Sequence, residues 1–168
     1  MPKTEQALRN KQSRDEGKLF ESYIETACEY YRIKGMAEIE KTPEPRRVIG
    51  RTGGRKSKMI CVNEKKAQPD FKGTLRGGTS IVFEAKHTSD GRIRQDVVTP
   101  EQAERLDSHY RLGASCWVVV SFCFHTYARI PWEVWRTMKG RYGRKYITEA
   151  ESREFGVPLI NGVVAILD

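Results

Sequence analysis

The segment from residue 79 to residue 124 constrains the fold of this chain more than any other part of the sequence. Its two ends, TSIVFEAK and ASCWVVVSFCF, are short and mostly apolar, which is typical of strands. Between them, TPEQAERLDSHYRLG has a helix start at Thr99, with Pro100 in the first turn and a stop at Gly113. With another helix earlier in the chain, this order predicts a mixed α/β sheet with helices on its faces.

The rest of the chain supplies that earlier helix and several further strands. From Asp15 to a stop at Gly35, apolar residues recur at helical spacing, whereas residues 1–14 are polar and are expected to be frayed or weakly helical. We predict three more strands, at 36–41, 69–75 and 127–130, the last of them at a sheet edge. One short helix is predicted at 132–139. A length of 168 residues suits one domain over the whole chain, 1–168.

Composition argues against two classes of protein. No apolar run is long enough to span a membrane, and the polar first residues do not resemble a secretory signal. The chain has four scattered cysteines and no C-x-x-C pair, which argues against a zinc site or a disulfide framework. A reducing cytoplasm is therefore the expected compartment.

Positive charge is concentrated in two parts of the chain. The net charge is +8, and residues 46–66 carry eight Lys and Arg side chains against a single acid, Glu64. Two short apolar runs around Gly53 and Gly54 predict a basic β-hairpin that projects from the domain. A second cluster lies at 139–145. One such cluster could be a solvated loop, but two favour a polyanionic partner. The candidate phosphate-binding residues are Arg46, Arg47, Arg51, Arg55, Lys56, Lys58, Lys65 and Lys66.

Two charged residues interrupt the apolar strand at 79–86. Because alternate residues of a strand share a face, Glu84 and Lys86 project together, roughly 6.6 Å apart along the strand. A carboxylate there can bind a hard divalent cation such as Mg²⁺, and the ammonium can orient a water or stabilise developing negative charge. Taken alone, the pair is equally compatible with an ordinary ion pair within one strand.

Asp70, on the preceding strand, favours a metal site over an ordinary ion pair for Glu84 and Lys86. A second carboxylate brought beside Glu84 raises the pKa of both acids unless a cation lies between them, which is how a Mg²⁺ site is built. An even-length turn around Gly77 and Gly78 would place Asp70 on the wrong face of the sheet. We therefore expect an odd-length turn or a bulge, with a glycine at positive φ. Side chains of Asp70 and Glu84 on opposite faces would exclude the metal site.

Several short motifs, in a fixed order, resemble a known family. They are GKLFESYI, AEIEKTPEP, DFKGTLRGG, IVFEAKHT and TPEQAERL…LGA, and they span roughly residues 17 to 131. The pattern PD…EAK is similar to that of the PD-(D/E)xK nucleases, and the whole run resembles the RecU-type Holliday junction resolvases of low-GC Gram-positive bacteria and their phages. The resemblance implies a restriction-endonuclease-like fold and a homodimer that cuts four-way DNA junctions with Mg²⁺, for which Mn²⁺ can substitute, in a bacterial cytoplasm.

The resemblance also implies roles for individual residues. Asp70 and Glu84 match the metal-binding carboxylates, and Lys86 matches the catalytic lysine. Glu21 matches the acid of the first helix near the metal, and Gln102 matches a glutamine on the later helix. The basic hairpin at 46–66 corresponds to the stalk that enters the junction. The chain departs from the family pattern at Gln68-Pro69-Asp70-Phe71-Lys72-Gly73, where the family has a Thr-Thr-Asp-Tyr-Asn-Gly-like run, and at His87, where it usually has an acid.

Other interpretations remain open for the outer residues and for the function. Glu21 could be one of several solvent-facing glutamates, and Gln102 could serve in a capping box with Thr99, a role compatible with a place in the site. His87 follows Lys86 onto the opposite face of the strand, so we expect it to be structural. The functional alternatives are another PD-(D/E)xK nuclease that cuts duplex or flapped DNA, and an architectural protein that binds junctions without cutting them.

Overall fold

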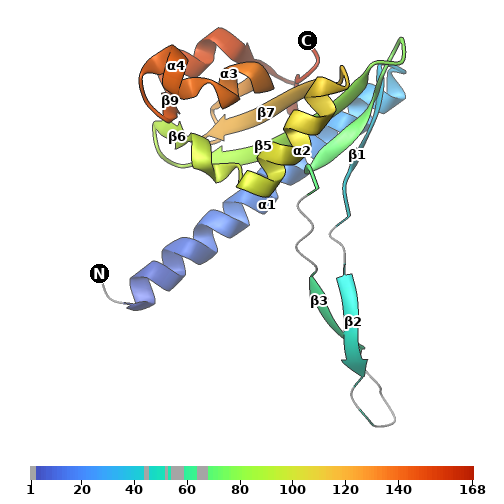
Figure 1. The fold of residues 1–168 in the computed structure, drawn as a ribbon, viewed down its shortest axis with the longest axis vertical. Coiled ribbons are helices and arrows are strands. Elements are labelled where there is room, and N and C mark those ends of the chain that lie inside the picture. The colour runs from blue at the N-terminus through green and yellow to red at the C-terminus, as the bar shows by residue number, and fades with distance from the viewer. Residues whose placement is uncertain (1–2, 44–45, 52, 54–58, 64–67) are drawn as a thin grey trace.

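The computed structural model describes residues 3–168, apart from 44–45, 52, 54–58 and 64–67. At its centre lies a six-stranded sheet in the order β1-β4-β5-β7-β8-β10 (Figure 1). β5 and β7 are parallel, whereas the other neighbouring strands pair in antiparallel fashion. The strands are β1 (Ala37–Lys41), β4 (Phe71–Leu75), β5 (Ser80–Thr88), β7 (Ser115–Phe122), β8 (Thr126–Pro131) and β10 (Gly156–Val157). The predicted mixed α/β sheet is therefore confirmed.

Helices cover both faces of this sheet, and each face buries a core of its own (Figure 1). On one face, α1 (Lys3–Ile33) packs Phe20 into the same core as Phe83 of β5. On the other face, α2 (Pro100–Arg111) packs Leu106 into the core that contains Val82. The alternation of β5 side chains between the two cores follows from the two-residue period of a strand. α3 (Trp132–Arg136) and α4 (Met138–Tyr142) extend the α2 layer.

Short elements complete the C-terminal half of the chain. β6 (Arg92–Arg94) pairs with β9 (Tyr146–Thr148), and β11 (Leu159–Ile160) pairs with β12 (Val163–Val164). The remaining elements are η1 (Gln95–Val97), α5 (Glu149–Ser152) and η2 (Arg153–Phe155). Val164 and Ile166 are buried against the α1 side of the sheet, so the C-terminal segment is part of the core.

The strands of the predicted basic hairpin are present. β2 (Arg46–Arg51) pairs with β3 (Met59–Asn63) in antiparallel fashion, with a register shift between Val48 and Gly50. Figure 1 shows this pair away from the six-stranded sheet, as a projecting arm. The predicted phosphate-binding residues Arg55, Lys56, Lys58, Lys65 and Lys66 lie outside the described residues. For Arg46, Arg47 and Arg51 only the strand, and not the side chain, is described.

The first helix is longer than the sequence pattern predicts. We expected a helix from Asp15 after a frayed or weakly helical segment, but α1 begins at Lys3 and runs without interruption to Ile33. Residues 4–15 are exposed, so no apolar contact marks them in the sequence. Once the packed part of the helix has formed, adding further turns costs little free energy. Bonds one turn apart, such as that between Gln12 and Glu16 at 2.9 Å, support the added turns.

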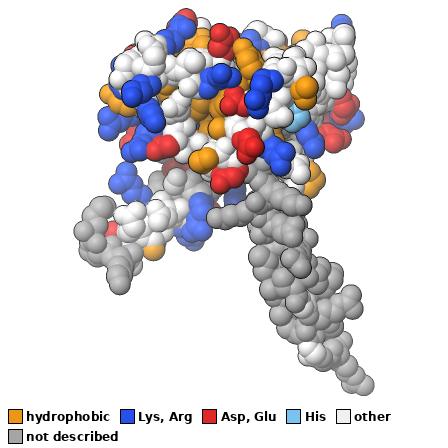
Figure 2. Space-filling view, in the orientation of Figure 1, with side chains coloured by type: hydrophobic (Ala, Val, Ile, Leu, Met, Phe, Trp, Pro, Cys, Tyr) orange, Lys and Arg blue, Asp and Glu red, His pale blue; other side chains and the backbone are white. Residues whose placement is uncertain are grey.

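Two further expectations differ from the structure. β8 was predicted as an edge strand, but the short strand β10 pairs with its outer side. The second basic cluster, at 139–145, is partly neutralised, because Arg141 pairs with Glu154 and Arg144 pairs with Glu151. On the face shown in Figure 2, Lys and Arg side chains are likewise interspersed with Asp and Glu. This cluster therefore gives weaker support to a polyanion site than its sequence indicates.

Candidate active site

The turn between β4 and β5 sets the position of Asp70. Leu75 N donates to Thr79 O at 2.8 Å, so the turn contains three residues, 76–78, and both of its glycines have positive φ. The resulting register pairs Phe71 with Phe83. Asp70, one residue before β4, is therefore opposite Glu84 and on the same face of the sheet. The expected odd-length turn with a glycine at positive φ is confirmed.

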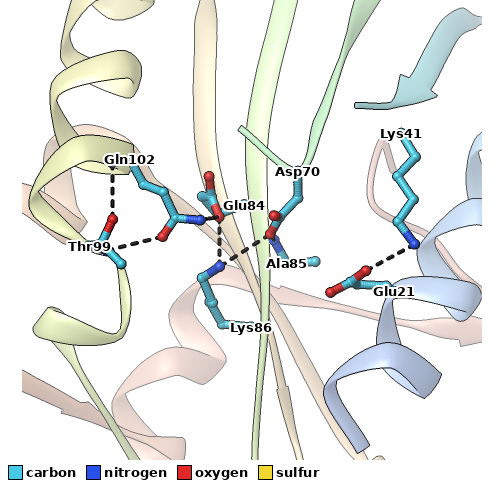
Figure 3. A network of polar contacts seen from close by, with 8 residues as sticks. All are labelled: Glu21, Lys41, Asp70, Glu84, Ala85, Lys86, Thr99 and Gln102. Carbon is cyan, nitrogen blue, oxygen red and sulfur yellow. Dashed lines mark hydrogen bonds and ion pairs between the residues drawn. The ribbon is translucent and has the colours of Figure 1, made fainter. Parts of the chain in front are cut away.

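Lys86 lies between the two carboxylates (Figure 3). Its Nζ donates to Asp70 Oδ2 at 3.2 Å and to Glu84 Oε2 at 2.6 Å. The backbone N–H of Ala85 also donates to Asp70 Oδ2, at 3.0 Å. Three of the predicted site residues are thus brought together by adjacent strands, and a main-chain donor holds the aspartate in place.

Gln102 joins this group from the first turn of α2. Its Nε2 donates to Glu84 Oε2 at 2.6 Å, while its Oε1 accepts from the N–H of Thr99 at 3.1 Å. Its own N–H donates to Thr99 Oγ1 at 3.3 Å, which completes a capping box. The capping box is therefore confirmed, and the same amide also donates to Glu84 (Figure 3).

The three charged groups of the site differ in how deeply they are buried. The Glu84 side chain is 0% exposed, whereas Lys86 is 18% and Asp70 is 23% exposed. Burial and the nearby charge of Asp70 raise the pKa of Glu84 to about 8, although Lys86 acts in the opposite direction. Burial alone would lower the pKa of Lys86, but the charges of Asp70 and Glu84 outweigh it and hold this pKa above its usual value.

The residues present fit a hard divalent cation. Glu84 Oε1 is buried and has no hydrogen-bond partner within the described part of the chain, so it retains free lone pairs. Asp70 and Glu84 together offer the carboxylate oxygens that Mg²⁺ prefers. A cation there would offset the repulsion between the two acids, a task that the Lys86 ammonium performs in this structure. However, nowhere in the described residues do three or more His, Cys, Asp or Glu side chains gather as a metal-binding group.

Glu21, the predicted acid of the first helix, is not in contact with this group and is held by a different partner. Lys41 Nζ of β1 pairs with Glu21 Oε2 at 2.9 Å and with Glu25 Oε1 at 2.6 Å. Lys41 is opposite Phe71 in the sheet, and the next residue, Thr42, donates its N–H to the Asp70 carbonyl at 2.8 Å. Sequence reasoning missed Lys41, whose position in AEIEK, before a proline, carries no sign of a partner on the first helix.

His87 lies on the opposite face of β5, as expected. It packs over Phe124, with ring centroids 4.1 Å apart, and lies 3.2 Å from Ser121 Oγ. Its side chain is 3% exposed, and burial lowers its pKa, although the neighbouring Glu16 acts in the opposite direction. These contacts are those of a packed core residue.

A mixed sheet that sets Asp70, Glu84 and Lys86 side by side, with helices on both faces, defines a metal-dependent nuclease of the PD-(D/E)xK type. The model of the RecU family, described as Recombination protein U, matches residues 15–161, and the chain belongs to this family.

Comparison with solved structures agrees with this fold. The chain is similar to the Holliday junction resolvase Hjc of the archaeal hyperthermophile Archaeoglobus fulgidus, with a TM-score of 0.51 and 16% sequence identity. The match covers 86% of this chain and 92% of that chain. At 16% sequence identity, this similarity shows a shared fold only. A search of curated proteins finds no match, and no helix in the described residues is long and apolar enough to cross a membrane.

Proposed function

We propose that this protein is an endonuclease that resolves four-way (Holliday) DNA junctions, and that residues 1–168 act as one nuclease domain. The observation that carries the proposal is the convergence of Asp70, Glu84 and Lys86, at contacts of 2.6 to 3.2 Å, in a member of the RecU family. The similar fold of Hjc, a Holliday junction resolvase, adds support.

In the proposed site, Asp70 and Glu84 would hold Mg²⁺, for which Mn²⁺ can substitute. When bound, the cation would supply positive charge that polarises the scissile phosphate and stabilises the leaving oxygen. Lys86 orients the attacking water and adds positive charge beside the phosphate. Gln102 keeps the Glu84 carboxylate in place through the 2.6 Å bond to Oε2. Glu21 is a further candidate ligand, and a metal would compete with Lys41 for its carboxylate.

The same proposal implies a branched DNA substrate and a dimeric enzyme. The basic arm that carries Arg46, Arg47, Arg51, Arg55, Lys56, Lys58, Lys65 and Lys66 binds phosphates without reading bases, as suits an enzyme that selects DNA by shape. A homodimer provides the two symmetric nicks, since its two-fold axis matches that of the junction. The place of action is the bacterial cytoplasm, for a protein encoded by the cell or by a phage.

Selectivity for branched DNA tests this proposal. We expect the wild-type protein to nick a labelled four-way junction in Mg²⁺ or Mn²⁺ and to leave a linear duplex of the same sequence largely uncut. The products should be a symmetric pair of nicks. Equal cutting of linear, flapped and four-way DNA would favour a general nuclease. Tight junction binding without any nicking in either metal would favour an architectural protein.

A further inference from the structure

A polar cleft of about 330 Å³ opens at the end of β5, away from the basic arm. One wall is the N-terminal half of α1, which extends past the sheet in Figure 1, and the other is the segment from residue 88 to residue 97. Ser89 Oγ donates to Glu16 Oε2 at 2.8 Å and joins the two walls. Segments far apart in the sequence therefore form one surface.

Three arginines from these two walls line the cleft: Arg9 of α1, and Arg92 and Arg94 of β6. Arg92 lies over the ring of Tyr146 at 5.2 Å, which limits its conformational freedom. Arg94 pairs with Asp96, but the two side chains are 72% and 63% exposed, so this pair is weak and easily exchanged for another anion. The guanidinium fork matches a phosphate group, and arginine is favoured wherever phosphates are recognised.

Two acids also line the cleft, Glu16 and Asp90. Glu16 Oε1 accepts from Gln12 of the same helix at 2.9 Å, and Oε2 accepts from Ser89 of the other wall, so both of its oxygens are hydrogen-bonded. Asp90 is an exposed residue of the bend after β5. The lining therefore carries three guanidinium groups against two carboxylates, a small excess of positive charge.

The cleft begins where β5 ends, close in sequence to the proposed site. Ser89, in the cleft, comes three residues after Lys86. His87 also lines the cleft and faces the opposite side of β5 from Lys86. The cleft is therefore a separate surface near the carboxylates and does not continue the site along the strand.

We propose that the cleft formed by Arg9, Arg92 and Arg94 binds the sugar–phosphate backbone of a junction arm. This inference rests on the proposed function and adds a second phosphate site, separate from the basic arm.

Binding measured against salt concentration tests the proposal. A triple variant, Arg9→Gln with Arg92→Gln and Arg94→Gln, is titrated with a fluorescent four-way junction in EDTA between 50 and 200 mM salt. Since each phosphate contact contributes about 0.9 to the slope of log K against log salt, the slope should fall by about 2 to 3. Hydroxyl-radical footprinting should also show backbone positions that the wild-type protein protects and the triple variant leaves open.

A matched control removes the same charge elsewhere. The variant Lys34→Gln with Arg111→Gln and Arg153→Gln changes three exposed residues outside the cleft and outside both basic clusters, and its slope should stay within about half a unit of wild type. The single variant Arg9→Gln, on an exposed helix position, should lower the slope by about 1 whatever the stability of the triple variant.

The outcomes separate this inference from the proposed function. An unchanged slope in the cleft variants, or an equal fall in the control, overturns the cleft while leaving the nuclease intact. A wild-type protein that neither binds nor nicks the junction overturns both proposals.

Discussion

At the scale of single residues, the site depends on how Glu84 is held. A buried carboxylate is costly unless donors or charges surround it. Here Lys86 and Gln102 both donate to Oε2, each at 2.6 Å, while Oε1 keeps its lone pairs. Oε1 is therefore the oxygen that can bind a cation. The two hydrogen bonds to Oε2 fix the direction in which Oε1 points.

Gln102 performs two tasks, and a pair of variants separates them. Gln102→Ala removes both the cap and the donor to Glu84, and we expect Mg²⁺-dependent nicking to fall about 10- to 100-fold, as is typical when a partner of a metal ligand is lost. Thr99→Ala removes the capping hydroxyl at a cost of about 1 kcal/mol but leaves the Gln102 amide in place.

Rates of junction nicking and thermal unfolding of both variants check this prediction. Thr99→Ala should be destabilised yet nick within about threefold of wild type, since its bond to Glu84 is intact. Equal losses of activity in the two variants would mean that Gln102 acts only as a cap.

At the scale of elements, the antiparallel pairing around β4 positions Asp70. Gly73 lies opposite Ile39 of β1, and a Cβ on Gly73 would lie 2.0 Å from the backbone oxygen of Glu38. The neighbours are backbone atoms, so they cannot move aside as a flexible side chain could. Glycine at this position is therefore required for β1 to pair with β4.

Two glycine substitutions test this packing. Gly73→Ala should destabilise the protein by about 1 to 3 kcal/mol, the usual range for forced overpacking. Gly17→Ala, in α1 with open space around the added carbon, should stabilise it by about 0.5 to 1 kcal/mol. Chemical denaturation of both variants gives the two changes in unfolding free energy. A stable Gly73→Ala protein would contradict the tight approach of β1.

Several elements could be predicted from the sequence, because their signals are local. The alternation in IVFEAK places Glu84 and Lys86 on one face, and Thr99 with Pro100 predicts the start of α2. The odd-length turn that sets Asp70 opposite Glu84 follows only from requiring a metal site, because the glycine pair is also compatible with an even-length turn. The extension of α1 to Lys3 could not be predicted, since exposed polar turns carry no apolar period. The contact of Lys41 with Glu21 depends on how α1 crosses β1, and no local pattern encodes a crossing.

At the scale of the whole molecule, charge is distributed unevenly around one site. The projecting pair β2–β3 lies to one side of the sheet, and the N-terminal half of α1 extends past it on another (Figure 1). On the face shown in Figure 2, the rest of the molecule carries Lys and Arg side chains interspersed with Asp and Glu. Under the two proposals above, phosphate binding is expected at the projecting arm and at the cleft beside α1, which extend from the sheet in different directions.

The most direct measurement of the central proposal compares wild type with Asp70→Asn on a labelled mobile four-way junction, with and without Mg²⁺. Asp70→Asn keeps the size of the side chain and an oxygen that can accept from Ala85 N, so the fold and junction binding in EDTA should be preserved. With one carboxylate of the pair removed, Mg²⁺-dependent nicking should fall at least about 1,000-fold. Equal Mg²⁺-dependent nicking by both proteins would contradict a metal site at Asp70 and Glu84.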